Sequence, residues 1–478
     1  MITFILSIVA LIVGYAVYGR IVEKIFGADN KRITPVHRLE DGVDYVPMSW
    51  WRIFLIQFLN IAGLGPIFGA IAGAMWGPVA FLWIVFGCIF GGAVHDYLSG
   101  MLSVRMDGIS APEIVGKYLG KNFMIFMRGF TIALMVLVGA VFIMGPAQIL
   151  SDLTNGFVTV TIWAVIIFIY YVLATLLPID KIIGKIYPVF GVALLFMAFG
   201  ISGSLLWNGY HIPELIPSNI YNMNANADKF PIIPMLFVTI ACGAISGFHS
   251  TQSPMMARCI ANEKLGRRVF YGAMVAEGIV ALIWAAAAMS FFGGVDQLNA
   301  EMAANKGNAT LVVNLVSNTL LGKVGAILAI LGVVAAPITT GDTAFRSARL
   351  ILADFLKIPQ IKIMKRIYIS VPLFLVGFLL TQIDFGIIWR YMAWSNQVLA
   401  TIMLWTLSVY MYKAGKFYWI VLLPAIFMTA VVSTYIMIAP EGFTMNHQAA
   451  YIIGGFITLL ICVFFVIRMN RKSEGIKN

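Results

Sequence analysis

The side chains of this chain that most resemble a reactive pair are a serine and a histidine three residues apart, Ser246 and His249. Both lie in the apolar stretch Ile240-Ala-Cys-Gly-Ala-Ile-Ser-Gly-Phe-His-Ser250. Their spacing places them on one helical face, as a nucleophile and its base require, but a third group must then orient the base. No acidic residue obviously partners the serine, and no Gly-x-Ser-x-Gly string surrounds it. A hydrolytic function is therefore a remote alternative.

Small residues mark the same stretch, and a second apolar stretch, Asn60-Ile-Ala-Gly-Leu-Gly-Pro66, shares this feature. Glycine adopts almost any backbone conformation and proline cannot donate to the helix ladder, so both stretches predict an interrupted helix. Backbone groups freed inside a membrane are tolerated only where protein or a water-filled cavity receives them. For either stretch alone, a simple kink with close helix packing is the alternative.

The composition excludes a water-soluble globular protein. Of 478 residues, 61% are hydrophobic and only 11% are charged, whereas a soluble domain carries about 25% charged residues. We attribute the net charge of +11 to basic loops that face anionic lipid, and not to nucleic-acid binding. The four cysteines form no Cys-x-x-Cys pair, so neither a zinc site nor a disulfide framework is predicted.

Apolar segments long enough to cross a bilayer, roughly 17–25 residues each, occur thirteen times in the chain. The predicted spans are Ile2–Tyr18, Ile53–Met75, Val79–Ser103, Gly129–Ile149, Val158–Leu177, Ile186–Trp207, Pro231–Ser253, Val269–Phe292, Gly322–Thr340, Ile369–Thr381, Ile387–Tyr412, Phe417–Met437 and Gln448–Val466.

The basic residues predict how these spans are oriented. With the N-terminus outside, all but four of the 32 Lys and Arg fall on the inner side; the exceptions are Lys229, Lys306, Lys323 and Arg390. Cytoplasmic loops retain Lys and Arg, so this asymmetry supports the count of thirteen. We expect a multi-pass protein of the bacterial cytoplasmic membrane with its C-terminus in the cytoplasm.

The interrupted stretches lie in the second and seventh spans, which cross the membrane in opposite directions. Such a pair indicates a midplane binding site between inverted repeats. We therefore expect an all-α polytopic membrane protein of about thirteen transmembrane helices, with a 5+5 inverted repeat and extra helices. Residues 1–478 would form one transporter domain: 1–52 the first span and a basic inner loop, 53–207 the first repeat, 231–412 the second, and 413–478 two additional spans and a basic tail.

The predicted binding site suits an anionic solute, because N–H groups freed at half-helix N-termini favour a carboxylate. A polar group in the eleventh span, Trp394-Ser-Asn-Gln397, is interpreted as cavity lining. The predicted substrate-binding residues are Asn60, Gly63, Gly65, Ser246, His249, Ser250, Trp394, Asn396 and Gln397.

Two candidate sites for a coupling ion follow from the oxygen-bearing residues. Thr339 and Thr340 end the ninth span, and with the carbonyl groups of Ala62 and Ala336 they could hold sodium, which prefers oxygen ligands. Threonines that bond back to their own helix are the alternative. Glu277 lies within the eighth span, where an ionisable group is costly to bury; it is either a proton carrier or a hydrogen-bonded structural residue.

Three charged or titratable residues are candidate gates. His95 and Asp96 are adjacent near the inner end of the third span and form either an inner gate or a water-facing helix end. Arg390 lies near the outer end of the eleventh span, where it either snorkels to water or pairs with a substrate carboxylate.

Several strings of the chain resemble the carbon starvation protein A (CstA) family. They are Ile33-Thr-Pro35, Asp41-Gly-Val-Asp-Tyr-Val-Pro47, Ile61-Ala-Gly-Leu-Gly-Pro66, Ile240 to His249 and Asp342 to Arg349. The resemblance runs from about Ile33 to about Tyr410, although the chain lacks the extra loop and tail material of long members. It implies a secondary transporter of leucine-transporter type. Peptide uptake during carbon starvation is assigned to members, and proton-coupled pyruvate uptake to close relatives.

The sequence thus predicts a transporter and not an enzyme: ion-coupled uptake of peptides by alternating access. A proton-coupled pyruvate symporter is the alternative. A channel is less favoured because the chain has no repeated filter string, and an intramembrane serine hydrolase stays remote. The expected partners are a small carboxylate-bearing solute and the lipid bilayer, and no cofactor is expected apart from the coupling ion, H+ or Na+.

Overall fold

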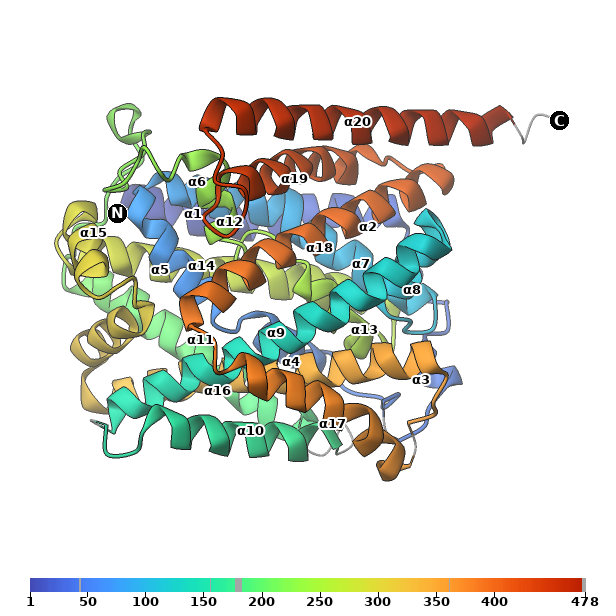
Figure 1. Cartoon of the computed structure of the whole chain (residues 1–478), viewed down its shortest axis with the longest axis horizontal. Helices are drawn as coiled ribbons and strands as arrows, with labels where there is room; N and C mark the ends of the chain where they lie inside the picture. The colour runs from blue at the N-terminus through green and yellow to red at the C-terminus, as the bar shows by residue number, and fades with distance from the viewer. Residues whose placement is uncertain (43, 155, 177–182, 361, 475–478) are drawn as a thin grey trace.

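The computed structural model describes the chain apart from residues 43, 155, 177–182, 361 and 475–478, and its elements are helices joined by loops (Figure 1). Leu177, Lys181 and Lys477, which the sequence analysis assigned to a span or to inner segments, lie outside the described residues. The helices are α1 (Ile2–Val13), α2 (Gly19–Phe26), α3 (Pro35–Arg38), α4 (Trp50–Ile61), α5 (Ala70–Gly73), α6 (Val79–Phe86), α7 (Ala93–Arg105), α8 (Ala111–Leu119), α9 (Lys121–Leu153), α10 (Val160–Leu176), α11 (Ile183–Trp207), α12 (Phe237–Thr239), α13 (Phe248–Ala257), α14 (Gly272–Phe291), α15 (Val295–Ala304), α16 (Ala309–Leu356), α17 (Ile363–Leu380), α18 (Phe385–Lys413), α19 (Trp419–Ile438) and α20 (His447–Glu474).

The all-α membrane architecture is confirmed. Within the described residues, eight helices are long and apolar enough to cross a membrane, and the bent pair Trp50–Ile61 and Gly65–Trp76 makes a ninth. Short π-helical turns join α1 to α2 and α6 to α7, so each of these pairs counts as one long helix. The remaining predicted spans fall on α10, α16, α18 and the interrupted pair α12 and α13.

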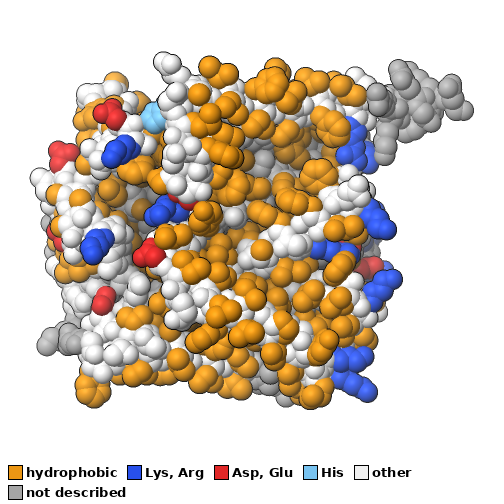
Figure 2. Space-filling view, in the orientation of Figure 1, with side chains coloured by type: hydrophobic (Ala, Val, Ile, Leu, Met, Phe, Trp, Pro, Cys, Tyr) orange, Lys and Arg blue, Asp and Glu red, His pale blue; other side chains and the backbone are white. Residues whose placement is uncertain are grey.

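Charged and apolar side chains are segregated along the long helices. In the view of Figure 1 these helices run from left to right. Figure 2 shows a row of Lys and Arg along the right end, where α3 and α8 lie, and a mixture of basic and acidic side chains at the left end. Hydrophobic side chains cover the middle of the same face. This is the pattern of a membrane protein whose basic loops lie on one side.

The predicted end of the ninth span is wrong, whereas its predicted start, Gly322, coincides with a kink in the helix. It was expected to end at Thr340, but α16 continues to Leu356 and buries Asp342, Arg346 and Arg349. Buried partners explain the extension. Tyr187 Oη donates to Asp342 at 2.6 Å, and Arg346 donates to the carbonyl oxygen of Ala174 at 2.7 Å. On the other side, α16 begins at Ala309 and contains a non-helical residue, Gly322, which has a φ of 63°.

The interrupted helices lie at the centre, where backbones approach closely. A Cβ on Gly65 would overlap the side chain of Cys242, and a Cβ on Gly247 would overlap backbone atoms of Ala400 and Asn396 on α18. Glycine at these two positions therefore lets the first break touch the second, and lets the second touch α18. The buried apolar residues around the breaks continue into one core.

We expect Gly247→Ala to destabilise the protein by about 1–3 kcal/mol, as overpacking of a core does. The overlap is with backbone atoms of α18, which cannot rotate away as a side chain would. The check is the midpoint of thermal unfolding of the purified protein in detergent. Gly203→Ala on α11 is the matched control, because a Cβ there meets nothing within 4 Å. Equal midpoints for the two variants would contradict the close approach.

Candidate solute and ion site

The first break separates α4 from the helical turn that begins at Gly65, and the two parts are bent by 54°. The freed end of α4 is met by α16: Thr340 Oγ1 donates to the carbonyl oxygen of Leu59 at 3.3 Å. A Cβ on Gly63 would lie 3.0 Å from the same hydroxyl oxygen. The end of the predicted ninth span thus lies beside the first break, at Leu59 and Gly63, whereas its predicted contact with the carbonyl group of Ala62 stays a prediction.

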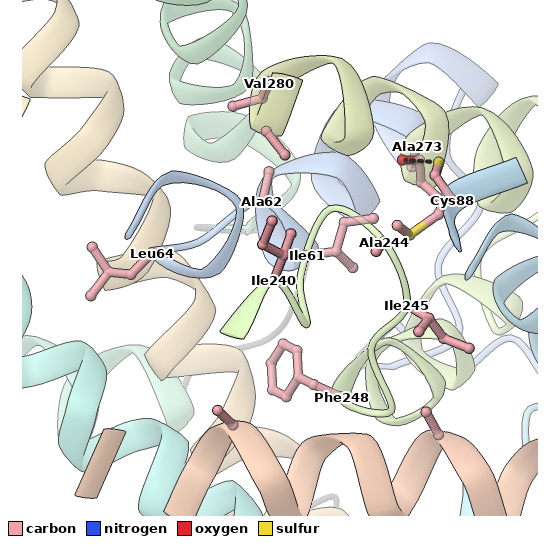
Figure 3. Packing of buried hydrophobic residues seen from close by; sticks show 14 of the residues in the cluster. Ile61, Ala62, Leu64, Cys88, Ile240, Ala244, Ile245, Phe248, Ala273 and Val280 are labelled. Atoms are coloured by element: carbon pink, nitrogen blue, oxygen red, sulfur yellow. Dashed lines mark hydrogen bonds between the residues drawn. The ribbon is translucent and has the colours of Figure 1, made fainter. Parts of the chain in front are cut away.

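The second break runs from residue 240 to residue 247, between α12 and α13. Gly243 has a φ of 90°, a conformation that L side chains rarely adopt. Its N–H donates to Glu277 Oε1 on α14 at 3.1 Å, and Trp83 Nε1 donates to the carbonyl oxygen of Ile240 at 2.9 Å. Figure 3 shows the two breaks side by side, with apolar side chains such as Ala62 and Ile240 around them. Both sequence stretches are thus interrupted, as predicted.

Asn396 on α18 holds the start of α13. Its Oδ1 accepts from the backbone N–H of Phe248 at 2.6 Å, and its Nδ2 donates to Ser246 Oγ at 2.9 Å. The adjacent Gln397 donates to the carbonyl oxygen of Ile245 at 3.1 Å. Two neighbouring amide side chains therefore stabilise the second break from the same helix.

A chain of buried titratable groups crosses three helices beside this break. Asp96 on α7 pairs with His95 Nδ1 at 2.8 Å and with His249 Nδ1 at 2.7 Å. On the other side of the ring, His249 Nε2 lies 3.4 Å from Glu277 Oε2. All four side chains are fully buried. One imidazole thus lies between two carboxyl groups from different helices.

The interpretation of His95 and Asp96 as a water-facing helix end is wrong, because both are buried and paired. Their role as an inner gate stays a prediction. The sequence indicates Asp96, His249 and Glu277 as separate candidates but does not show that they form one cluster. Each is a titratable residue within an apolar span, where burial is costly without a partner, and this feature could have suggested that they pair with one another.

The threonines of the predicted sodium site bond to their own helix. Thr339 Oγ1 and Thr340 Oγ1 donate to the carbonyl oxygen of Ala336 at 2.7 and 2.8 Å. The N–H of Ala62 donates back to Phe58 at 2.8 Å. Back-bonding, the alternative given for these hydroxyls, is thus present, and sodium binding stays a prediction.

Other predicted site residues lie apart from the breaks. Trp394 Nε1 donates to the carbonyl oxygen of Val432 on α19 at 3.0 Å, and Arg390 is exposed, with its Nε 3.4 Å from Glu441 Oε2. Ser250, by contrast, adjoins the second break: it lies in the first turn of α13, where its hydroxyl donates to the carbonyl oxygen of Gly247 at 2.7 Å. The structure therefore brings together Asn60, Gly63, Gly65, Ser246, His249, Ser250, Asn396 and Gln397 near the breaks, but not Trp394 or Arg390.

The serine of the apparent reactive pair is engaged elsewhere. Ser246 Oγ also donates to Asn396 Oδ1 at 3.2 Å, while both ring nitrogens of His249 face carboxyl groups. A nucleophile needs its base within hydrogen-bond reach. This arrangement supports a binding site more than a hydrolytic one.

Known proteins resemble the chain in sequence. The sequence model of the carbon starvation protein CstA family matches residues 1–215 and 158–323. An uncharacterized membrane protein of Haemophilus influenzae is 44% identical over 353 residues, which cover 64% of this chain and 95% of that protein. The peptide transporter CstA of Campylobacter jejuni is 28% identical over 57% of this chain and 47% of its own length. The pyruvate/proton symporter BtsT of Escherichia coli is 26% identical over 58% and 47%. The chain thus spans about half the length of these two named transporters.

Solved structures confirm the leucine-transporter-type fold. MhsT in complex with L-phenylalanine has a TM-score of 0.55 at 13% identity, over 87% of this chain and 99% of that one. The Eremococcus coleocola manganese transporter has a TM-score of 0.52 at 12% identity, over 91% and 99%. At such identities the likeness concerns the fold alone, whereas the sequence matches concern descent: the chain belongs to the carbon starvation protein CstA family.

Proposed function

We propose that this protein is a secondary active transporter that takes up small carboxylate-bearing solutes, peptides first among them, by alternating access and ion coupling. The observation that carries the proposal is the pair of interrupted helices that touch at the centre of the molecule, beside a buried titratable cluster. A helix broken in mid-membrane leaves backbone groups that a polar solute can satisfy. A transmembrane helix used only for anchoring needs no such break.

Unpaired buried polar atoms around the breaks support a solute site. Among the described residues, both amide atoms of Gln57, Nδ2 of Asn60, and Oε1 of Gln252 and Gln397 are buried without a hydrogen-bond partner. Buried polar groups are almost always paired, so several on helices that meet at one place favour a polar ligand there. The backbone N–H groups of Gly63 and Leu64 also lack a partner in the described part of the chain. Such N–H groups suit a carboxylate.

A proton is the coupling ion that the arrangement favours. Glu277 accepts a hydrogen bond from the N–H of Gly243 in the second break. Its other carboxylate oxygen faces His249, which pairs with Asp96 on α7. A proton gained or lost in this cluster changes contacts at the break itself. The hydroxyls of the sodium candidate site are, by contrast, bonded to their own helix. The name of the relative BtsT, a pyruvate/proton symporter, agrees with proton coupling and keeps pyruvate as the second candidate solute.

A cavity at the basic end offers a route to the inner side. Its volume is about 520 Å³, and a separate, smaller cavity of about 20 Å³ is lined in part by residues of α13. Arg258 lines both cavities, and Thr251 and Ser347 line the smaller one. With the basic end facing the cytoplasm of the bacterium, the N-terminus would lie outside and the C-terminus inside. The larger cavity is lined by three basic side chains, Arg128, Arg258 and Lys357, and by two acidic ones, Glu113 and Asp354, so its charge excess is basic.

The function is tested by uptake into proteoliposomes. We expect an inward proton gradient to drive accumulation of a labelled dipeptide above its equilibrium level, while empty liposomes show none. Labelled pyruvate tested in parallel, and a sodium gradient in place of the proton gradient, separate the alternatives. If neither solute accumulates under any gradient, the proposal is wrong.

Glu277→Gln tests the coupling role. The amide keeps the shape of the side chain but cannot carry the proton, so we expect gradient-driven accumulation to fall to the equilibrium level while solute exchange at equal pH continues. Glu40→Gln is the matched control, because Glu40 is exposed in the loop before α4. Unchanged accumulation in the Glu277 variant would reject this residue as the proton carrier.

A further inference from the structure

Three side chains with metal-binding atoms converge at the second break: Cys242, His249 and Glu277. Cys Sγ, the imidazole nitrogen and a carboxylate oxygen all lie within 4.8 Å of one another. His249 Nε2 and Glu277 Oε2 are buried, and neither makes a hydrogen bond within the described residues. Two unpaired polar atoms therefore point at one place, with a free thiol as the third neighbour.

The distance between His249 Nε2 and Glu277 Oε2 fits two ligands of one tetrahedral metal ion better than a direct hydrogen bond. The 3.4 Å between His249 Nε2 and Glu277 Oε2 is long for a charge-assisted hydrogen bond, which measures about 2.7–2.9 Å. Two ligands at about 2.1 Å from one tetrahedral zinc ion lie roughly 3.4 Å apart. A sulfur ligand lies about 2.3 Å from zinc, and Cys242 Sγ is within 4.8 Å of the other two ligand atoms.

Neighbouring groups leave one atom of His249 and one of Glu277 free to bind a metal. Asp96 Oδ2 lies 2.7 Å from His249 Nδ1, so the ring can donate its Nδ1 proton there and present the lone pair of Nε2. A carboxylate behind a histidine is the common support of zinc-binding imidazoles. The N–H of Gly243 occupies Glu277 Oε1, which leaves Oε2 for the metal.

Charge also favours a divalent ion of the zinc class. One thiolate and one carboxylate cancel a charge of +2, so the complex adds no net charge to a buried site. Sulfur and imidazole ligands select zinc-like ions, whereas sodium, magnesium and calcium prefer oxygen. Binding releases the thiol proton, because the thiolate is the ligand.

We propose that Cys242, His249 and Glu277 bind one zinc-class divalent cation, and that bound zinc inhibits transport. Cys242 lies within the break, His249 belongs to α13, and Glu277 belongs to α14. A metal that joins all three ties the second break and α13 to α14, so these segments cannot move relative to one another. The inhibition rests on the transport function proposed above, whereas the binding does not.

Binding is measured on the purified full chain in detergent. CdCl2 is titrated while the thiolate-to-cadmium charge-transfer absorption is recorded, and ZnCl2 is added in competition. We expect saturation at one cadmium per chain and loss of the band in Cys242→Ser. Cys462→Ser is the matched control and keeps the band, because Cys462 lies on the outlying helix α20. Glu277→Gln, and Asp96→Asn as a positioning variant, should each weaken binding by about tenfold or more.

Each outcome of the titration decides the proposal. No saturable band in the unmodified protein, or a band that survives in Cys242→Ser, overturns the site. Size-exclusion profiles show whether the serine variant folds; if it does not, weakened binding in the Glu277 and Asp96 variants supports the site, and unchanged binding overturns it.

Inhibition is measured in proteoliposomes, with each variant compared with its own zinc-free rate. Half-inhibition should need at least about tenfold more ZnCl2 in Cys242→Ser than in Cys462→Ser. Equal zinc sensitivity overturns the inhibition. Cadmium binding in a protein that transports neither peptide nor pyruvate would refute the proposed function and leave the metal site standing.

Discussion

A backbone N–H or C=O inside a bilayer has no water to pair with, and this constraint governs the centre of the molecule. Two interrupted helices expose such groups, and the chain meets them with side chains from distant helices. Asn396 accepts from the start of α13, Glu277 accepts from the N–H of Gly243, and Gln397 donates to the carbonyl oxygen of Ile245. Each of these bonds joins segments that are far apart in sequence. The breaks are therefore stable only in the context of the whole bundle.

The same hydrogen bonds make the conformation of the breaks sensitive to any group that can replace one of the partners. A buried backbone group that loses its partner costs about 1–3 kcal/mol, so a helix that carries the partner cannot move away unless something replaces it. A solute carboxylate, a proton or water can be that replacement. Under the proposed alternating access, the polar side chains that hold the breaks are thus the ones whose exchange of partners accompanies the conformational change. Solute binding and conformational change would then use one set of residues.

Local composition made much of the fold predictable. Apolar runs gave the spans, and clustered Gly and Pro gave both breaks, because these signals act on the backbone where they occur. Contacts between spans were not predictable, because they depend on how each helix is rotated. Trp394 and Asn396 show this: two residues apart on a helix means about 200° of rotation, so one side chain meets α19 and the other meets the break. The charges of Asp342 and Arg346 suggested the end of a span, yet both residues lie buried within α16. Asp342 accepts a hydrogen bond from Tyr187, and Arg346 donates one to the carbonyl oxygen of Ala174.

His249 connects the titratable groups at the second break, because it lies between two carboxyl groups from different helices. Its ring touches a carboxyl group of α7 on one side and faces a carboxyl group of α14 on the other. Groups this close in a low-dielectric interior do not titrate independently; they exchange protons as one unit. Because Glu277 also holds the N–H of Gly243, a change in that unit alters the attachment of the second break to α14. Under the proposed proton coupling, the conformation of the break and the protonation of the cluster form one equilibrium, and a ligand that prefers one state of the break favours, by linkage, the protonation state that goes with it.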